Sequence, residues 1–257
     1  YGKFLKKTKE NGISSLIEDE VSGLIYYVTN NDGFYSYDPL SEEIIPYDIS
    51  ISFNKERHSN VHYLYQDKGR TIWIGAWGGG TFRFDINTRK IINFSLHSNQ
   101  AKGSSELYND VLYIYQDKLD ALWFGTNGGG LCKIDNKDNK FGGITFNQKN
   151  KKSLNEPIWS ILKDKDERLW LGIKGSQNLY YSNNDKLFNE IKTSTPIIEN
   201  AKGGIKVIYQ DLNKKIWIGG NYFLNEVDNK NLKIKPINVK QKGVHGKITT
   251  LYQTSDS

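Results

Sequence analysis

The sequence has no methionine and one cysteine, and it has no long apolar run. The single thiol, Cys132, cannot form an internal disulfide, and we expect it to pack in the interior of a sheet. No apolar run approaches about 18 residues and no signal-type hydrophobic region is present, so we expect this segment neither to span a membrane nor to carry an export signal. A chain that begins at Tyr1 without an initiator methionine is expected to be a processed or excised piece.

Histidine is also scarce, and the four histidines have no metal-ligand spacing (His58, His62, His97 and His245). We therefore expect no metal site and no cofactor, and no Ser-His-Asp set can be assembled from a recognisable motif. The charge balance is 35 Lys and Arg against 29 Asp and Glu, spread along the chain rather than gathered on one basic element. This pattern favours a solvated lysine-rich surface, does not predict nucleic-acid binding, and leaves an anionic ligand as the alternative.

Internal repetition organises the chain. An aromatic residue followed by a short apolar core recurs at intervals of 47, 50, 47 and 47 residues, at Tyr26, Trp73, Trp123, Trp170 and Trp217. An aspartate precedes each aromatic residue by six or seven positions, at Asp19, Asp67, Asp117, Asp164 and Asp211. An aliphatic residue lies six positions before each aspartate, at Ile13, Val61, Val111, Ile158 and Ile205.

Each copy predicts four short β-strands separated by turn residues, and in the second copy these are 61–66, 71–76, 81–85 and 90–94. A repeated four-stranded antiparallel unit of this length is typical of a β-propeller blade, so the predicted fold is all-β. The predicted organisation is a single propeller segment, 1–257. Its blades are 13–47, 61–94, 111–146, 158–188 and 205–237, with partial blades at 1–10 and 244–257. We expect the recurrent Trp to pack between blades and the Asp to cap a turn.

Two copies contain a triple glycine, in "TIWIGAWGGGTF" and "ALWFGTNGGGLC". A phosphate-binding loop would place lysine and a helix after the glycines, whereas alternating apolar residues follow them here. The glycines are therefore predicted to form hairpin turns with positive φ.

The segments "VHYLYQDKGRTIWIGAWGGGTFRFD", "VLYIYQDKLDALWFGTNGGGLCKID" and "IWSILKDKDERLWLG" resemble the two-component regulator propeller repeat. The first copy departs from it at Tyr26, and the fourth and fifth lack the triple glycine. The resemblance implies a seven-bladed propeller from the periplasmic sensor region of a hybrid histidine kinase, anchored in the membrane through other parts of the parent protein and homodimeric at full length. It also implies that this segment senses a ligand and is not itself an enzyme.

In a propeller, the turns after each second strand and the loops leading into each innermost strand lie on one face. The turns place Asn30, Trp77, Asn127, Lys174 and Asn221 there, and the loops add His58, Tyr108 and Trp159. Amides, indoles and basic groups suit an oligosaccharide, neutral or acidic, because carboxylate and sulfate pair with lysine and a pyranose stacks on indole. The alternative for each asparagine is that it satisfies a turn conformation.

Two other function classes stay open. A propeller hydrolase or lyase acting on an acidic polysaccharide would need a carboxylate pair, and Asp110 and Glu156 are the candidates. A protein-interaction scaffold would bind a partner protein and no small ligand.

Overall fold

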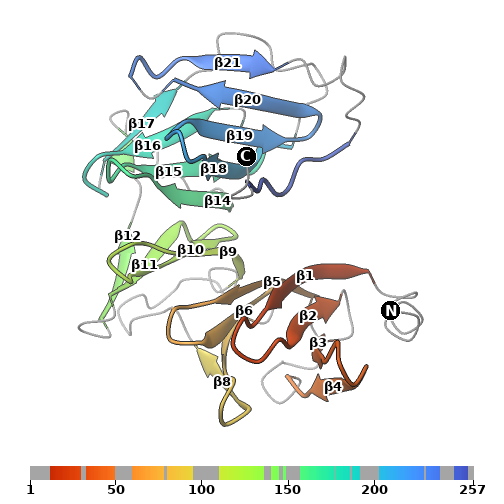
Figure 1. Cartoon of the computed structure of the whole chain (residues 1–257). Coiled ribbons are helices and arrows are strands. Elements are labelled where there is room, and N and C mark those ends of the chain that lie inside the picture. Colours follow the sequence, from red (N-terminus) through yellow and green to blue (C-terminus); the bar gives the residue numbers. More distant parts are fainter. Residues whose placement is uncertain are drawn as a thin grey trace. The chain divides into compact units, whose positions relative to one another are not determined.

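The structure, a computed structural model, describes residues 12–29, 33–49, 60–77, 80–94, 110–135, 140–144, 147–148, 157–176, 178–185, 187–191, 203–228, 230–237 and 246–253. These residues form β-strands and turns without a helix, and so contain no apolar helix that could cross a bilayer. The prediction of an all-β fold made of four-stranded antiparallel sheets is confirmed (Figure 1).

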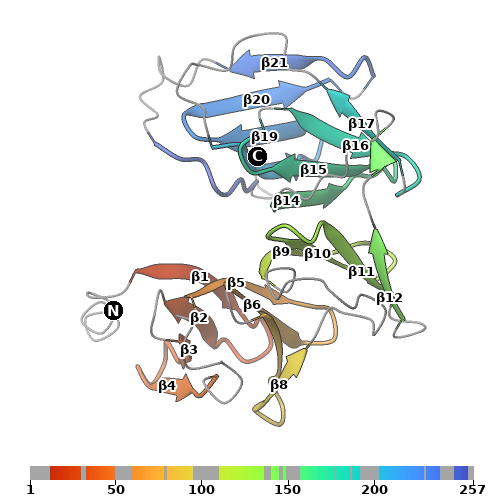
Figure 2. The same ribbon diagram turned by 180° about the vertical axis from the view of Figure 1, so that it is seen from behind.

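The strands form five sheets, in each of which strands that follow one another along the chain lie side by side (Figures 1 and 2). The first sheet contains β1 (Ile13–Glu18), β2 (Ile25–Thr29), β3 (Gly33–Tyr37) and β4 (Ile44–Tyr47). The second contains β5 (Asn60–Gln66), β6 (Thr71–Trp77), β7 (Gly80–Asp85) and β8 (Lys90–Phe94). The third contains β9 (Val111–Gln116), β10 (Leu122–Thr126), β11 (Leu131–Asp135) and β12 (Lys140–Ile144).

The fourth sheet contains β14 (Ile158–Lys163), β15 (Leu169–Ile173), β16 (Leu179–Ser182) and β17 (Leu187–Ile191). It gains a fifth strand, β13 (Asn147–Gln148), which pairs in parallel with β17 and was not predicted. The fifth sheet contains β18 (Ile205–Gln210), β19 (Ile216–Gly220), β20 (Phe223–Val227) and β21 (Ile234–Ile237).

The chain divides into two compact units, which are described separately. Unit 1 comprises residues 1–127 and 134–141, and unit 2 comprises residues 128–133 and 142–257. Each unit has its own apolar cluster between neighbouring sheets. In unit 1 the rings of Tyr26, Phe34 and Phe84 meet between the first and second sheets. In unit 2, Trp170 packs with Ile208 and other apolar residues between the fourth and fifth sheets.

The aspartate of each copy from the second to the fifth is bound to the tryptophan of the same copy. In the third copy, Asp117 Oδ2 accepts a hydrogen bond of 2.9 Å from the indole of Trp123, and Oδ1 accepts from the backbone of Leu119 and Ala121. The same indole–carboxylate bond joins Trp73 to Asp67, Trp170 to Asp164 and Trp217 to Asp211. The predicted turn cap is thus confirmed, and the carboxylate also fixes the indole.

The first copy shows what happens when tyrosine replaces tryptophan. Asp19 is 1% exposed and accepts hydrogen bonds from Ser22 of its own turn. It also binds Arg70 and Gln66 of the second sheet, and the Arg70 guanidinium lies 2.5 Å from Asp19 Oδ2. The hydrogen bond from Arg70 is the main reason that the pKa of Asp19 lies well below its usual value. The departure at Tyr26 therefore converts a bond within a sheet into an ion pair between sheets.

Neighbouring sheets approach closely where the tryptophan is followed two residues later by glycine. A Cβ atom on Gly75 would lie 2.6 Å from the carbonyl oxygen of Val111, at the start of the next sheet. A Cβ on Gly219 would lie 2.8 Å from Ile248 Cγ2, on the segment that follows the fifth sheet. These glycines are required by close packing rather than by backbone conformation.

Glutamine side chains add a second tie between neighbouring sheets. Glutamine precedes the repeated aspartate at Gln116 and Gln210. Gln253 has the same position in the last segment, where Thr254 replaces the aspartate. Each Oε1 accepts from the backbone N–H that follows the preceding copy's aspartate, at 2.8 to 2.9 Å, with Lys68, Lys165 and Leu212 as donors. The segment 246–253 therefore repeats a contact made by β9 and β18.

The triple glycine at 128–130 connects the paired strands β10 and β11, as predicted for a hairpin. Gly128 and Gly130 have φ values of 98° and 78°, and Gly80 has a φ of 86°. Gly78 and Gly79 lie outside the described residues. The glycines thus shape the backbone between β10 and β11, and β11 follows them directly.

Replacing Asp117 with asparagine should lower the free energy of unfolding by about 2 kcal/mol, because an amide nitrogen would face the indole N–H of Trp123 and leave a buried donor without an acceptor. Urea denaturation measures this change. The matched control is Asp120→Asn in the same turn, which removes an exposed ion pair with Lys68 and should cost under about 1 kcal/mol. Equal losses in the two variants would contradict the role of the indole bond.

Candidate functional site

The first strand of every sheet contains a one-residue bulge at the same position. The pairing register shifts between Ile13 and Ser15 in β1, and at the corresponding place in β5, β9, β14 and β18. The residue passed over differs in each copy: Ser14, His62, Leu112, Trp159 and Lys206. A bulge re-aims one side chain without disturbing the ladder on either side of it. The repeat therefore presents a different side chain from the same backbone site in each sheet.

In unit 2, two lysines lie beside the ring of the bulge residue Trp159, and the charge of a third acts on one of them. Lys206, the bulge residue of β18, places Nζ 4.8 Å from the centre of the Trp159 ring. Lys174, just after β15, places Nζ 5.9 Å from the same ring. Lys247 is the third, and its charge contributes to a lowered pKa of Lys206, for which burial is the larger cause. Two ammonium groups thus share one indole, and a third cation acts on one of them.

Backbone bridges hold these residues in place. Lys174 pairs with Gly204, and its N–H donates to the carbonyl of Pro157 at 2.8 Å. Asn221, just after β19, pairs with Lys247. Lys174 and Asn221 are the two turn positions predicted to lie beside the site. Each therefore pairs with the backbone of the loop or segment that follows it in the chain.

Gly203 and Gly204 allow the loop before β18 to lie against both turns. A Cβ on Gly203 would overlap the side-chain amide of Asn221, and one on Gly204 would overlap the backbone of Ile173 and approach Gly175. Gly204 also has a φ of 82°, a conformation that other residues adopt with strain. Asn221 Oδ1 is buried and has no hydrogen-bond partner in the described part of the chain. The side-chain amide of Asn221 thus packs against the loop at Gly203.

In unit 1, the equivalent positions hold a different set of groups. Asp110 precedes β9 and is 1% exposed, and its backbone carbonyl accepts from the N–H of Asn127 at 2.9 Å. Burial lowers the pKa of His62, and the charge of Asp110 partly opposes this shift. The rings of Tyr63 and Tyr113 lie 5.0 Å apart, and burial raises the pKa of Tyr63 well above its usual value. This region is tightly packed, in contrast to the exposed lysines of unit 2.

The sequence predictions fall into three groups. Trp159, Lys174 and Asn221 lie together in unit 2, and Asn127 lies beside Asp110 in unit 1. Trp77 ends β6, and its side chain is not described. Four predicted residues lie outside the described residues: Asn30, His58, Tyr108 and Glu156.

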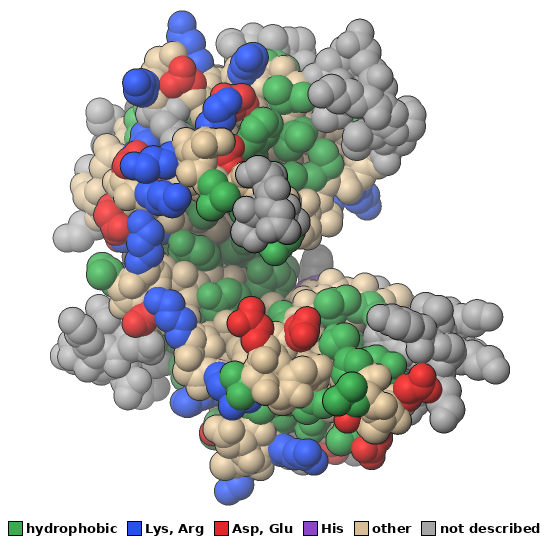
Figure 3. Space-filling view, in the orientation of Figure 1, with side chains coloured by type: hydrophobic (Ala, Val, Ile, Leu, Met, Phe, Trp, Pro, Cys, Tyr) green, Lys and Arg blue, Asp and Glu red, His purple; other side chains and the backbone are tan. Residues whose placement is uncertain are grey.

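Two lysines of the unit 2 site were missed by sequence reasoning, Lys206 and Lys247. Lysine is the commonest surface residue type in this chain, so composition gives no reason to select these two. The position of Lys206 in the repeat could have identified it, because Lys206 directly follows Ile205, one of the aliphatic residues that lie six positions before each aspartate. Elsewhere on unit 2, Lys and Arg side chains are interspersed with Asp and Glu, as expected for a solvated surface (Figure 3).

The chain has the β-propeller fold, and it contains two-component regulator propeller repeats. The family model named "Two component regulator propeller" matches residues 105–128 and 152–175. These matches coincide with the third and fourth copies, and the resemblance to this repeat is thereby confirmed. No curated protein sequence matches the chain.

Two similar solved structures come from B. thetaiotaomicron and are extracellular domains of proteins described as hybrid two-component systems. BT3049 is 20% identical with a TM-score of 0.65, over 91% of this chain and 30% of its own. BT4673 is 18% identical with a TM-score of 0.68, over 88% of this chain and 31% of its own. This chain therefore spans about a third of the length of either domain.

An enzyme shares the fold as well. Virginiamycin B lyase from Staphylococcus aureus, in a catalytically inactive form with quinupristin, is 16% identical with a TM-score of 0.67, over 91% of this chain and 72% of its own. Identities this low show a common fold and nothing about a common activity.

Replacing Gly203 with alanine should destabilise the chain by about 1 to 3 kcal/mol, because the added methyl group would displace the Asn221 amide. The same substitution in an Asn221→Ala background should cost markedly less. Thermal or urea unfolding of the two single variants and the double variant gives this coupling. Additive losses would show that the loop does not rest on Asn221.

Proposed function

We propose that this chain is a ligand-sensing propeller segment from the extracytoplasmic, periplasmic part of a hybrid two-component sensor histidine kinase. The family repeats and the likeness to extracellular domains of hybrid two-component systems support this assignment. The kinase and the membrane anchor belong to other parts of the parent protein, which we propose acts as a homodimer. This segment itself performs no chemistry.

We propose that the ligand is an oligosaccharide. The observation that carries this proposal is the group of exposed polar and basic side chains around Trp159, built on the bulges and turns that vary from copy to copy. A rigid repeated scaffold with one variable position per copy is suited to recognising a ligand that offers many hydroxyl groups. Ligand binding would change this segment, and the rest of the sensor would respond to that change.

The catalytic alternative has less support among the described residues. Asp110 is almost fully buried and lies beside His62, so its carboxylate is not presented to a polymer. Its proposed partner, Glu156, lies outside the described residues. A polysaccharide lyase or hydrolase would release unsaturated products or new reducing ends, which a simple incubation would detect.

Isothermal titration of the full chain with a panel of neutral and acidic oligosaccharides tests the proposal. We expect at least one member to bind, and Lys174→Ala to weaken that binding, because Lys174 is exposed at the centre of the site. The matched control is Lys165→Ala, an exposed lysine on the turn after β14, which should leave binding unchanged. Failure of every oligosaccharide to bind would contradict the proposal that the ligand is an oligosaccharide, and would favour a protein-interaction scaffold.

A further inference from the structure

Two of the lysines near Trp159, Lys206 and Lys247, carry positive charge that the described acidic residues do not neutralise. Lys206 is half-buried, while Lys174 and Lys247 are exposed. Elsewhere in unit 2, Lys163 has a carboxylate partner in Asp185 and Lys215 has one in Glu226. Among the described residues, neither Lys206 nor Lys247 forms an ion pair with a carboxylate. The charge of Lys247 acts unfavourably on that of Lys206, and an anion placed between the two would offset this repulsion.

Trp159 holds two of these ammonium groups in place. Ammonium groups are attracted to the ring of an indole at the distances seen here, 4.8 Å for Lys206 and 5.9 Å for Lys174. A ring that already has cations beside it is poorly placed to stack on a pyranose. The indole is therefore a positioning residue that orients lysine N–H groups, and this changes the role predicted for it from the sequence.

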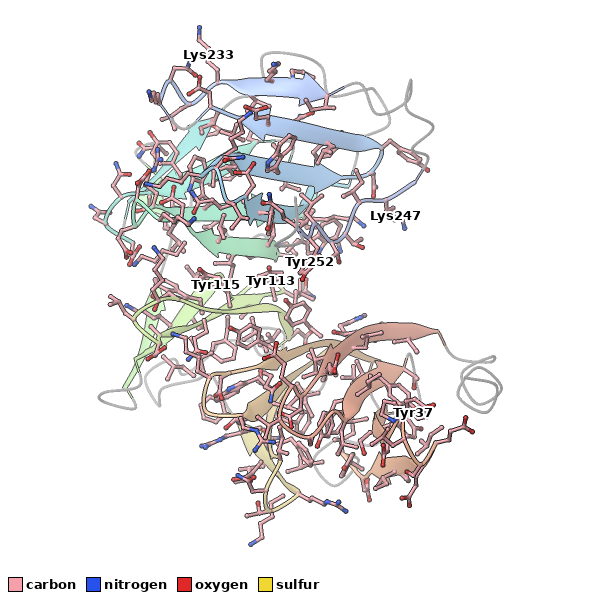
Figure 4. All side chains as sticks on the ribbon, viewed as in Figure 1. Tyr37, Tyr113, Tyr115, Lys233, Lys247 and Tyr252 are labelled. Carbon is pink, nitrogen blue, oxygen red and sulfur yellow. The ribbon has the colours of Figure 1, made fainter. Side chains whose placement is uncertain are left out.

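The backbone beneath the lysines is closely packed. Gly203 and Gly204 bring the loop before β18 against the turns that carry Lys174 and Asn221. The bridge between Asn221 and Lys247 then fixes the third lysine on the same side. In Figure 4, Lys247 and Lys233 stand at opposite ends of the fifth sheet, so the group around Trp159 is separate from the charged turns at the other end. The cations are gathered at one end of the sheet by backbone contacts rather than by chance proximity on a loose surface.

We propose that Trp159, Lys174, Lys206 and Lys247 form a binding site for an anionic group, a carboxylate or a sulfate, carried by an acidic sugar. This inference rests on the proposed function and specifies the chemical class of its ligand. Each ammonium group offers three N–H donors, and charge-assisted hydrogen bonds to an anion are about twice as strong as those between neutral groups. A neutral sugar would gain little from these lysines and would leave the repulsion between Lys206 and Lys247 in place.

The test compares acidic sugars with neutral analogues of the same skeleton. Isothermal titration of the full chain uses digalacturonate and its dimethyl ester, a sulfated disaccharide and its desulfated form, and sodium sulfate against sodium chloride at equal ionic strength. We expect an acidic member to bind at least about tenfold more tightly than its neutral analogue, which corresponds to about 1.4 kcal/mol. Sulfate alone should bind the same lysines more weakly.

Substitutions then assign the effect to the site. Lys206→Gln should remove the preference for the acidic sugar, and Lys206→Arg should retain most of it because the charge is kept. Lys233→Gln, at the opposite end of the sheet, is the matched control and should leave the preference unchanged (Figure 4). Trp159→Leu should reduce the preference for acidic over neutral sugar while Trp159→Phe retains it, since phenylalanine also offers a ring face to a cation.

The outcomes separate this inference from the proposed function. Equal binding of acidic and neutral sugars, unaffected by Lys206→Gln, would overturn the anion site and leave oligosaccharide sensing intact. Binding of sulfate to Lys206, with no sugar bound, would overturn the acidic-sugar ligand together with the sugar-sensing proposal and leave an adventitious ion only. Binding of nucleic acid or anionic lipid vesicles in preference to the sugars would also overturn it.

Discussion

The rest of the structure depends on the hydrogen bond between the repeated aspartate and the indole of a tryptophan six residues later. The carboxylate binds the backbone of the turn with one oxygen and the indole with the other. One side chain therefore closes the turn between the first two strands and fixes the ring that packs against a neighbouring sheet, as Trp73 does against Phe124. At Asp117 and Asp164 burial makes this bond obligatory, because an ionised carboxylate without donors is costly to keep from water. Local turn geometry and packing between sheets are thus set by the same residue.

Much of the fold could be predicted from the sequence, because its determinants are periodic. Alternating apolar residues defined the strands of the second copy to within one residue, and fixed spacings aligned the five copies. Strand β13 could not be predicted, since Asn147 and Gln148 carry no apolar alternation. The bond from Gln66 and Arg70 to Asp19 was also missed, because it compensates for one substitution, Tyr26, and has no counterpart in the other copies.

The candidate site was predictable only in part, for a physical reason. Positions after the second strand follow from the repeat, so Lys174 could be placed on the same face as Trp159. A bulge adds one residue to a strand without a compositional mark, so Lys206 looked like an ordinary strand residue. Its importance comes from neighbours that are distant in sequence, Trp159 and Lys247. The periodicity of the sequence predicts the features that all copies share, whereas ligand recognition depends on the side chains that differ between copies.

The environment of the tryptophans has an optical consequence. Of the five indoles whose side chains are described, four donate their N–H to an aspartate, and Trp159 instead has lysine ammonium groups beside its ring. Fluorescence of an indole responds to charges near the ring, so movement or neutralisation of those lysines alters the emission of Trp159. The four aspartate-bound indoles supply a constant background. Trp159 is therefore an intrinsic fluorescent reporter at a position where the repeat does not require tryptophan.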